Sequence, residues 1–94
     1  MAAAYVIGIR EKMKDPAQME TYARKAGPTL SDATMVALYG RHEVLEGDLA
    51  DGVVIVKFDS YDAARRWYDS EAYKEAMPHR LAGADYRIIL VEGV

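Results

Sequence analysis

The sequence contains no cysteine, which excludes disulfide bonds, thiolate catalysis and cysteine-ligated metals. Only two histidines are present, His42 and His79, with neither H-x-H nor H-x-x-x-H spacing, so we predict no metal site. Basic residues never form a run longer than two and the net charge is -3, which argues against a nucleic-acid partner.

Motifs of common catalytic and targeting functions are also lacking. No G-x-S-x-G motif and no glycine-rich loop leading into a helix occurs, and the sequence implies no cofactor. No apolar stretch reaches the roughly 18 residues that a membrane span requires, and no basic segment precedes the apolar residues near the N-terminus. We therefore expect a cytoplasmic protein without membrane contact.

The length of 94 residues fits a single domain over residues 1–94. With 51% hydrophobic and 29% charged residues, the chain has the composition of a soluble globular protein. A domain of this size has a thin core, so a partner subunit could contribute to its stability.

Four segments have the composition of β-strands, and a turn-rich connection over residues 47–52 predicts that the second and third form a hairpin. A loop is expected at residues 82–84, before the last strand. The predicted strands are residues 4–10, 35–46, 52–58 and 85–92.

Helix signals fill the two long gaps between these strands. Asp15, followed by a proline, can cap a first helix that ends at the Gly-Pro pair 27–28. Ser60 and Ser70 can cap two pieces of a second helical region, and Pro78 is expected to end it. The order β-α-β-β-α-β predicts an α+β, ferredoxin-like fold, a four-stranded antiparallel sheet with its helices on one face.

The strands do not alternate as a sheet with one wet face should. In the first strand, Tyr5, Ile7 and Ile9 share one face and Val6 the other, so both faces are apolar. The helices can cover only one of them. We therefore predict that a second copy covers the other face, which gives a homodimeric α+β barrel.

Four short stretches then indicate a family: Leu45-Glu46-Gly47, the block Trp67-Tyr68-x-Ser70-x-x-Tyr73, Arg80 after it, and Val91-Glu92-Gly93. Nearly the whole chain resembles the uncharacterised family called domain of unknown function 1330, of the dimeric α+β barrel superfamily. The resemblance implies a ferredoxin-like protomer and a barrel dimer. The wider superfamily includes cofactor-independent monooxygenases, isomerases, haem-degrading enzymes and ligand sensors, and the residues here select none of these activities.

Two ionisable residues are candidates for chemistry. His42 lies within the predicted second strand and could transfer a proton, or it could simply bond to water or the backbone at a strand edge. Arg80 could bind a carboxylate through its planar guanidinium, or it could form a structural ion pair with Glu46 or Glu92.

The aromatic residues suggest a binding site. Seven tyrosines against one phenylalanine is an unusual ratio for a plain core, and it suits an apolar pocket with a few polar points. Trp67, Tyr68 and Tyr73 could form its walls or belong to the core, and Tyr39 could add to the lining; Arg10 and Arg41 are further possibilities.

We therefore expect a small dimeric barrel that binds, and could convert, a small organic molecule, aromatic or carboxylate-bearing. The pocket is expected between the sheet and the second helical region, and a cofactor-free oxygenase or isomerase is the sharpest enzymatic form of this hypothesis. The alternative is a non-catalytic dimeric module, either a ligand sensor or a structural protein.

Overall fold

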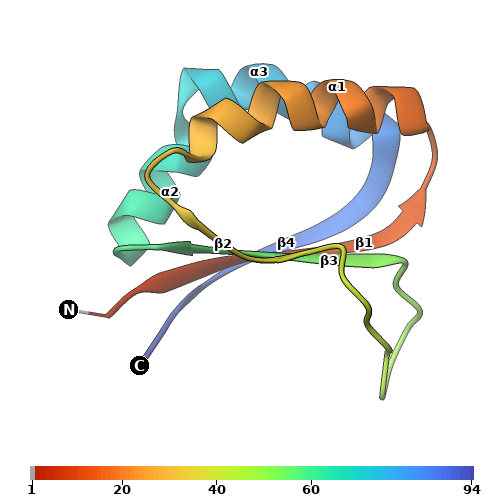
Figure 1. Ribbon diagram of the computed structural model, residues 1–94, viewed down its shortest axis with the longest axis horizontal. Helices are drawn as coiled ribbons and strands as arrows, with labels where there is room; N and C mark the ends of the chain where they lie inside the picture. The colour runs from red at the N-terminus through yellow and green to blue at the C-terminus, as the bar shows by residue number, and fades with distance from the viewer. Residues whose placement is uncertain (1) are drawn as a thin grey trace.

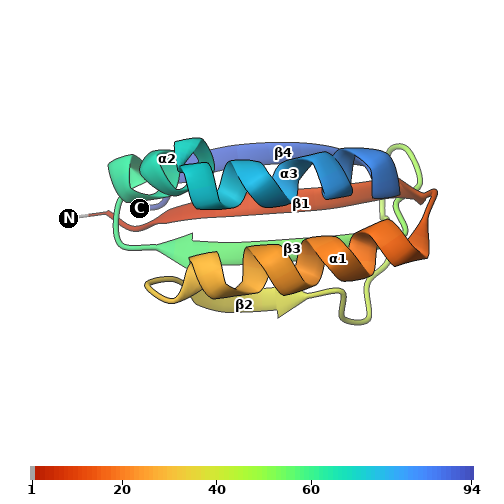
Figure 2. The same ribbon diagram turned by 90° about the horizontal axis from the view of Figure 1, so that it is seen from above.

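The computed structural model describes residues 2–94 and has the predicted α+β, ferredoxin-like architecture. The sheet is antiparallel with strand order β2-β3-β1-β4, and all helices lie on one of its faces (Figures 1 and 2). The elements are β1 (Ala4–Met13), α1 (Pro16–Ala26), the 3-10 helix η1 (Gly27–Leu30), β2 (Thr34–Leu38), β3 (Gly52–Phe58), α2 (Tyr61–Asp69), α3 (Glu71–Gly83) and β4 (Ala84–Glu92). No helix within residues 2–94 is both long and apolar enough to cross a membrane.

Side-chain caps begin the three α-helices, as predicted. The Asp15 carboxylate accepts backbone N–H bonds at the start of α1, at 3.1 and 3.4 Å. The Ser60 hydroxyl accepts the N–H of Ala63 at 3.0 Å, and that of Ser70 accepts the N–H of Tyr73 at 3.2 Å. Since Ser70 also ends α2, the second helical region is divided into two pieces at this residue.

Pro78 does not end α3, so this part of the prediction was wrong. The helix continues to Gly83, and β4 starts at Ala84, which leaves no loop at 82–84. A proline inside a helix costs about 3 kcal/mol, but α3 buries Tyr73, Ala76 and Arg80 along one face, and this packing offsets the cost. Because seven residues make two turns, Tyr73 and Arg80 point from the same face.

The second strand is much shorter than residues 35–46. It ends at Leu38, because Tyr39 has a φ of 51°, in the left-handed region, which ends the extended backbone. Residues 39–51 then form a loop that hangs beyond the sheet, away from the helices (Figure 1). His42 therefore lies in an exposed loop, with its ring nitrogens 3.3 Å and 3.2 Å from the carbonyl oxygens of Gly40 and Ala50.

β1 is longer than predicted and continues to Met13, with a register shift between Arg10 and Lys12. Its alternation divides the sheet into two apolar faces. The inner face, under the helices, includes the buried Val6 and Val56. The outer face includes Ile7, which is directly opposite Ile55 on β3 and Ile89 on β4, and none of the three is fully buried.

Candidate functional site

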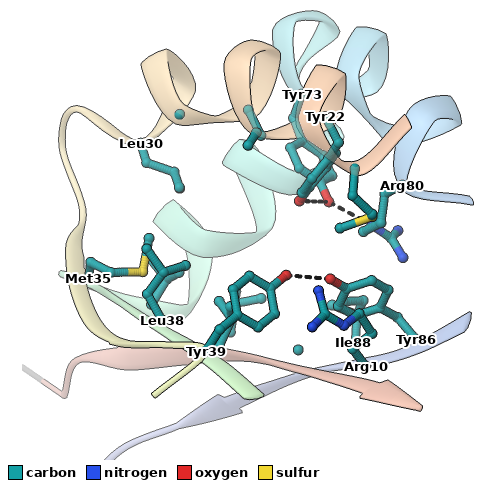
Figure 3. A pocket seen from close by; sticks show the side chains of 18 of the residues that line it. Arg10, Tyr22, Leu30, Met35, Leu38, Tyr39, Tyr73, Arg80, Tyr86 and Ile88 are labelled. Carbon is teal, nitrogen blue, oxygen red and sulfur yellow. Dashed lines mark hydrogen bonds between the residues drawn. The ribbon is translucent and has the colours of Figure 1, made fainter. Parts of the chain in front are cut away.

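A cavity of about 430 Å³ lies between the inner face of the sheet and the helices α1 and α3. Its exposed lining residues, among them Glu20 on α1 and Leu38 on β2, place the mouth between α1 and the edge strand. Figure 3 shows apolar side chains such as Leu30 and Met35 at one end and the polar groups at the other. The polar end is built by Arg10, Tyr22, Tyr39, Tyr73, Arg80 and Tyr86.

The helices contribute one connected set of polar groups. Arg80 Nε donates a hydrogen bond to Tyr73 Oη at 3.2 Å, and Tyr73 Oη lies 2.9 Å from Tyr22 Oη (Figure 3). Since the Tyr73 oxygen accepts from Arg80, its own hydrogen can go to Tyr22. The hydroxyl hydrogen of Tyr22 is then available to a ligand.

The sheet contributes a second set below the first. Arg10 lies opposite Tyr86 in the register of β1 and β4, and its guanidinium carbon is 4.4 Å from the centre of the Tyr39 ring. The hydroxyls of Tyr39 and Tyr86 bond to each other, and Arg10 Nε donates to Asp51 Oδ1. One hydroxyl hydrogen of the tyrosine pair is unused by this bond.

The position of Tyr39 depends on its backbone and on one neighbour. Its positive φ turns the chain at the end of β2. Gly52 makes room for its ring, because a Cβ at position 52 would come within 2.7 Å of a ring carbon. The site thus requires glycine at this position on β3.

Arg80 is buried, with 5% of its surface exposed, yet none of the ion pairs within residues 2–94 includes it. The structural ion pair with Glu46 or Glu92 is therefore not formed. Arg80 lines the cavity and bonds through Nε, and since no fully buried side-chain nitrogen of the described residues lacks a partner, its terminal nitrogens keep some accessible surface for a further partner. Burial alone would lower the pKa of Arg80, but the Tyr73 oxygen raises it above its ordinary value, and the guanidinium stays charged.

Two tyrosines of the cavity, Tyr22 and Tyr86, have raised pKa values. Burial, and then the adjacent Tyr73 hydroxyl, raise the pKa of Tyr22 well above the usual value for tyrosine. Burial and the bond to Tyr39 likewise raise the pKa of Tyr86. These hydroxyls therefore act as neutral hydrogen-bond donors or acceptors rather than as bases.

Trp67 forms part of the cavity wall beside Tyr73. Its ring centre lies 4.2 Å from that of Tyr73, and its Nε1 donates to the Thr29 hydroxyl at 2.9 Å. Tyr68 packs against both rings, at 6.3 Å from Trp67 and 5.5 Å from Tyr73, but it does not line the cavity. Tyr68 therefore supports the wall from behind.

The structure brings four predicted site residues together around the cavity: Tyr39, Trp67, Tyr73 and Arg80. The cavity lies between the sheet and the helices, and α1 contributes more of its lining residues than the second helical region, where the pocket was expected. His42 is not among the lining residues, so no proton transfer by His42 inside the cavity is supported by its position. No three His, Asp or Glu residues gather as a metal site among residues 2–94.

Tyr22, Tyr86 and Asp51 were not predicted as site residues from the sequence. Tyr22 lies on the apolar side of α1, which faces the core. Because a tyrosine hydroxyl inside a protein needs a hydrogen-bond partner, this position could have indicated a polar group in the cavity. Tyr86 shares a strand face with Ile88, which the alternation already indicated. Nothing local connects Asp51 to Arg10, because 41 positions separate them.

These features define a ferredoxin-like α+β protein with an internal, arginine-containing cavity. The chain belongs to the family described as Domain of unknown function (DUF1330), which matches residues 3–94. No protein of curated function has a matching sequence.

Solved structures of low sequence identity have the same fold. A protein of unknown function from Rhodopseudomonas palustris aligns with a TM-score of 0.78 and 20% identity, over 99% of this chain and 83% of the other. SnoaB, a cofactor-independent oxygenase from Streptomyces nogalater, aligns at 0.65 and 16%, over 96% and 91%. A dimeric ferredoxin-like protein of unknown function from Thermobifida fusca aligns at 0.61 and 19%, over 97% and 91%.

Proposed function

We propose that this protein binds a small, largely apolar organic molecule with a carboxylate or similar acidic group in the cavity under α1 and α3. The observation that carries this proposal is the buried guanidinium of Arg80, which faces an apolar cavity without a carboxylate partner. An unpaired buried charge is costly unless something neutralises it, and arginine suits the two oxygens of a carboxylate.

The rest of the lining fits such a ligand. The free hydroxyl hydrogens of the Tyr22–Tyr73 and Tyr39–Tyr86 pairs add neutral donors beside Arg80. Trp67 and the aliphatic residues supply walls for an aromatic or aliphatic body. Small-molecule sites typically combine an apolar lining with a few convergent polar groups, as this one does.

Binding without conversion is the form of the proposal that the geometry favours. A cofactor-free oxygenase or isomerase needs a base to remove a proton from its substrate. Of the cavity-lining residues within residues 2–94, only Glu20 carries a carboxylate, and it is exposed at the mouth. The likeness to SnoaB is one of fold, so a ligand-binding or sensing role is the simpler proposal.

A thermal-shift screen against aromatic acids, lactones, quinones and haem tests the proposal. We expect aromatic acids to raise the melting temperature, and we expect Arg80→Met to abolish the shift. Arg24→Met, on the exposed side of α1, removes the same charge outside the cavity and should leave the shift unchanged. A shift that survives in Arg80→Met contradicts the assigned site.

We also propose that the outer face of the sheet binds a second copy of the chain. The row Ile55, Ile7 and Ile89 crosses three strands on this face, and Tyr5, Ile9 and Val53 extend it. The dimeric Thermobifida fusca structure of the same fold supports this arrangement. An identical face is self-complementary under two-fold symmetry, so both apolar surfaces leave water together.

Analytical ultracentrifugation at micromolar concentration tests the dimer. We expect a dimer for the unmodified protein and a monomer for Ile55→Asp, because the new carboxylates would be buried at the interface. Leu81→Asp adds the same charge at an exposed position on α3 and should remain dimeric. A monodisperse monomer of the unmodified protein would refute this part of the proposal.

A further inference from the structure

Two guanidinium groups line the same end of the cavity, and both approach Tyr86. Arg10 lies directly opposite Tyr86 across β1 and β4, and the Arg80 guanidinium carbon lies 5.6 Å from the centre of the Tyr86 ring. Figure 3 shows the two arginines on either side of this residue. A ligand oxygen at the polar end therefore meets the field of both charges.

Arg10 has a carboxylate partner, whereas Arg80 has none within residues 2–94. Arg10 Nε donates to Asp51, whose other oxygen accepts the backbone N–H of Met13 at 2.9 Å, so this carboxylate is held from two sides. The bond from Arg10 keeps the pKa of Asp51 below its usual value, so Asp51 stays ionised at neutral pH. Arg80 has no such partner and is the cation left for a ligand.

Glu20, the one acidic residue among the cavity-lining residues of 2–94, does not change the charge balance at the polar end. Glu20 is exposed at the mouth and forms no ion pair within residues 2–94, so water and salt screen its charge. The Asp51 side chain is also 41% exposed, but it bonds directly to Arg10. Glu20 can only oppose, and never attract, a further negative charge on the ligand.

We propose that Asp51 sets the charge of the ligand, so that the cavity accepts a monocarboxylate and discriminates against adjacent dicarboxylates and neutral esters. This inference rests on the proposed function. Asp51 acts through Arg10 and is a specificity-determining residue without lining the cavity itself. The ligand's single carboxylate binds Arg80 and a tyrosine hydroxyl, and its apolar body extends toward Trp67.

Three related naphthalene compounds test this in isothermal titration calorimetry at pH 7.5: 2-naphthoate, its methyl ester and 2,3-naphthalenedicarboxylate. Charge-assisted hydrogen bonds contribute enough that we expect 2-naphthoate to bind about tenfold or more tightly than either other compound. In Asp51→Asn, which removes the charge and keeps one acceptor oxygen for either Arg10 or Met13, the dicarboxylate should gain about tenfold relative to 2-naphthoate.

Two variants separate this charge effect from structural damage. Asp85→Asn removes the same charge from an exposed residue that pairs with Lys14, and it should keep the original preference. Arg10→Gln combined with Asp51→Asn removes both charges of the pair and should restore the preference for 2-naphthoate. A general loosening of the loop would not be reversed in this way.

The outcomes distinguish the two proposals. If Asp51→Asn leaves the ratio of the dicarboxylate to 2-naphthoate unchanged, the charge inference is wrong while the proposed function stands. If the methyl ester binds as tightly as 2-naphthoate, the assignment of an acidic ligand to Arg80 fails, and the inference fails with it. If none of the three compounds binds the unmodified protein, both the inference and the proposed function fail.

Discussion

The two ends of the space between helices and sheet differ sharply, although the same strand, β1, runs beneath both. At one end, α2 packs directly on β1, β3 and β4, and the buried residues Ala4, Phe58 and Ala64 fill the space. At the other end, α1 packs mainly on α3, and the space below holds arginines and tyrosines around a cavity. The first end is filled by packed apolar side chains. The second, which we call the hollow end, keeps a cavity whose polar groups bond to one another.

The largest effect is expected at the packed end. Phe58→Ala removes a buried ring whose centre lies 5.3 Å from that of Trp67, and it leaves a cavity between α2 and the sheet. We expect a loss of about 3–5 kcal/mol in the free energy of unfolding, measured by urea denaturation. If Phe58→Ala lowers the free energy of unfolding by less than about 0.5 kcal/mol, as a typical surface substitution does, the packed end is not where the stability of the fold lies.

A smaller effect is expected where the two ends meet. Tyr73→Phe keeps the ring but removes the oxygen that joins Tyr22 to Arg80. Since it leaves buried groups without a partner, we expect a loss of about 1–3 kcal/mol in unfolding free energy. Tyr61→Phe, at an exposed tyrosine on α2, is the matched control and should be close to neutral.

The smallest effect on stability is expected at the hollow end. Arg80→Met replaces an uncompensated buried cation by an apolar chain of similar length, so the unfolding free energy should stay the same or rise by about 1 kcal/mol. The same change abolishes ligand binding in the proposal above. A marked loss of stability would instead make Arg80 a structural residue and would weaken the contrast between the two ends.

Much of the helical framework could be predicted from the sequence, because its signals are local. Asp15, Ser60 and Ser70 cap helices through neighbours a few positions away, and these bonds form as predicted. The prediction failed at Pro78, where burial of one helix face outweighs a local helix-breaking signal. It failed again after Leu38, where apolar residues of an exposed loop resembled a strand.

The hollow end was predictable only in part. Trp67, Tyr73 and Arg80 belong to one helical region and to the family pattern, so they could be recognised as a group. His42 was chosen because it was placed in a strand that ends before it. The bond from Arg10 to Asp51 joins residues that only the folded chain brings together, and no spacing rule could connect them.

Gly8 lies on the floor of the cavity, where there is room for a small side chain. It lies between Val6 and Arg10 on the inner face, and a Cβ added there would come no closer than 3.4 Å to its nearest neighbour, the end of the flexible Ile88 side chain. Position 8 can therefore carry alanine without any backbone rearrangement. A methyl group at position 8 would make the cavity shallower at its floor, while Arg10 and Arg80 stay in place.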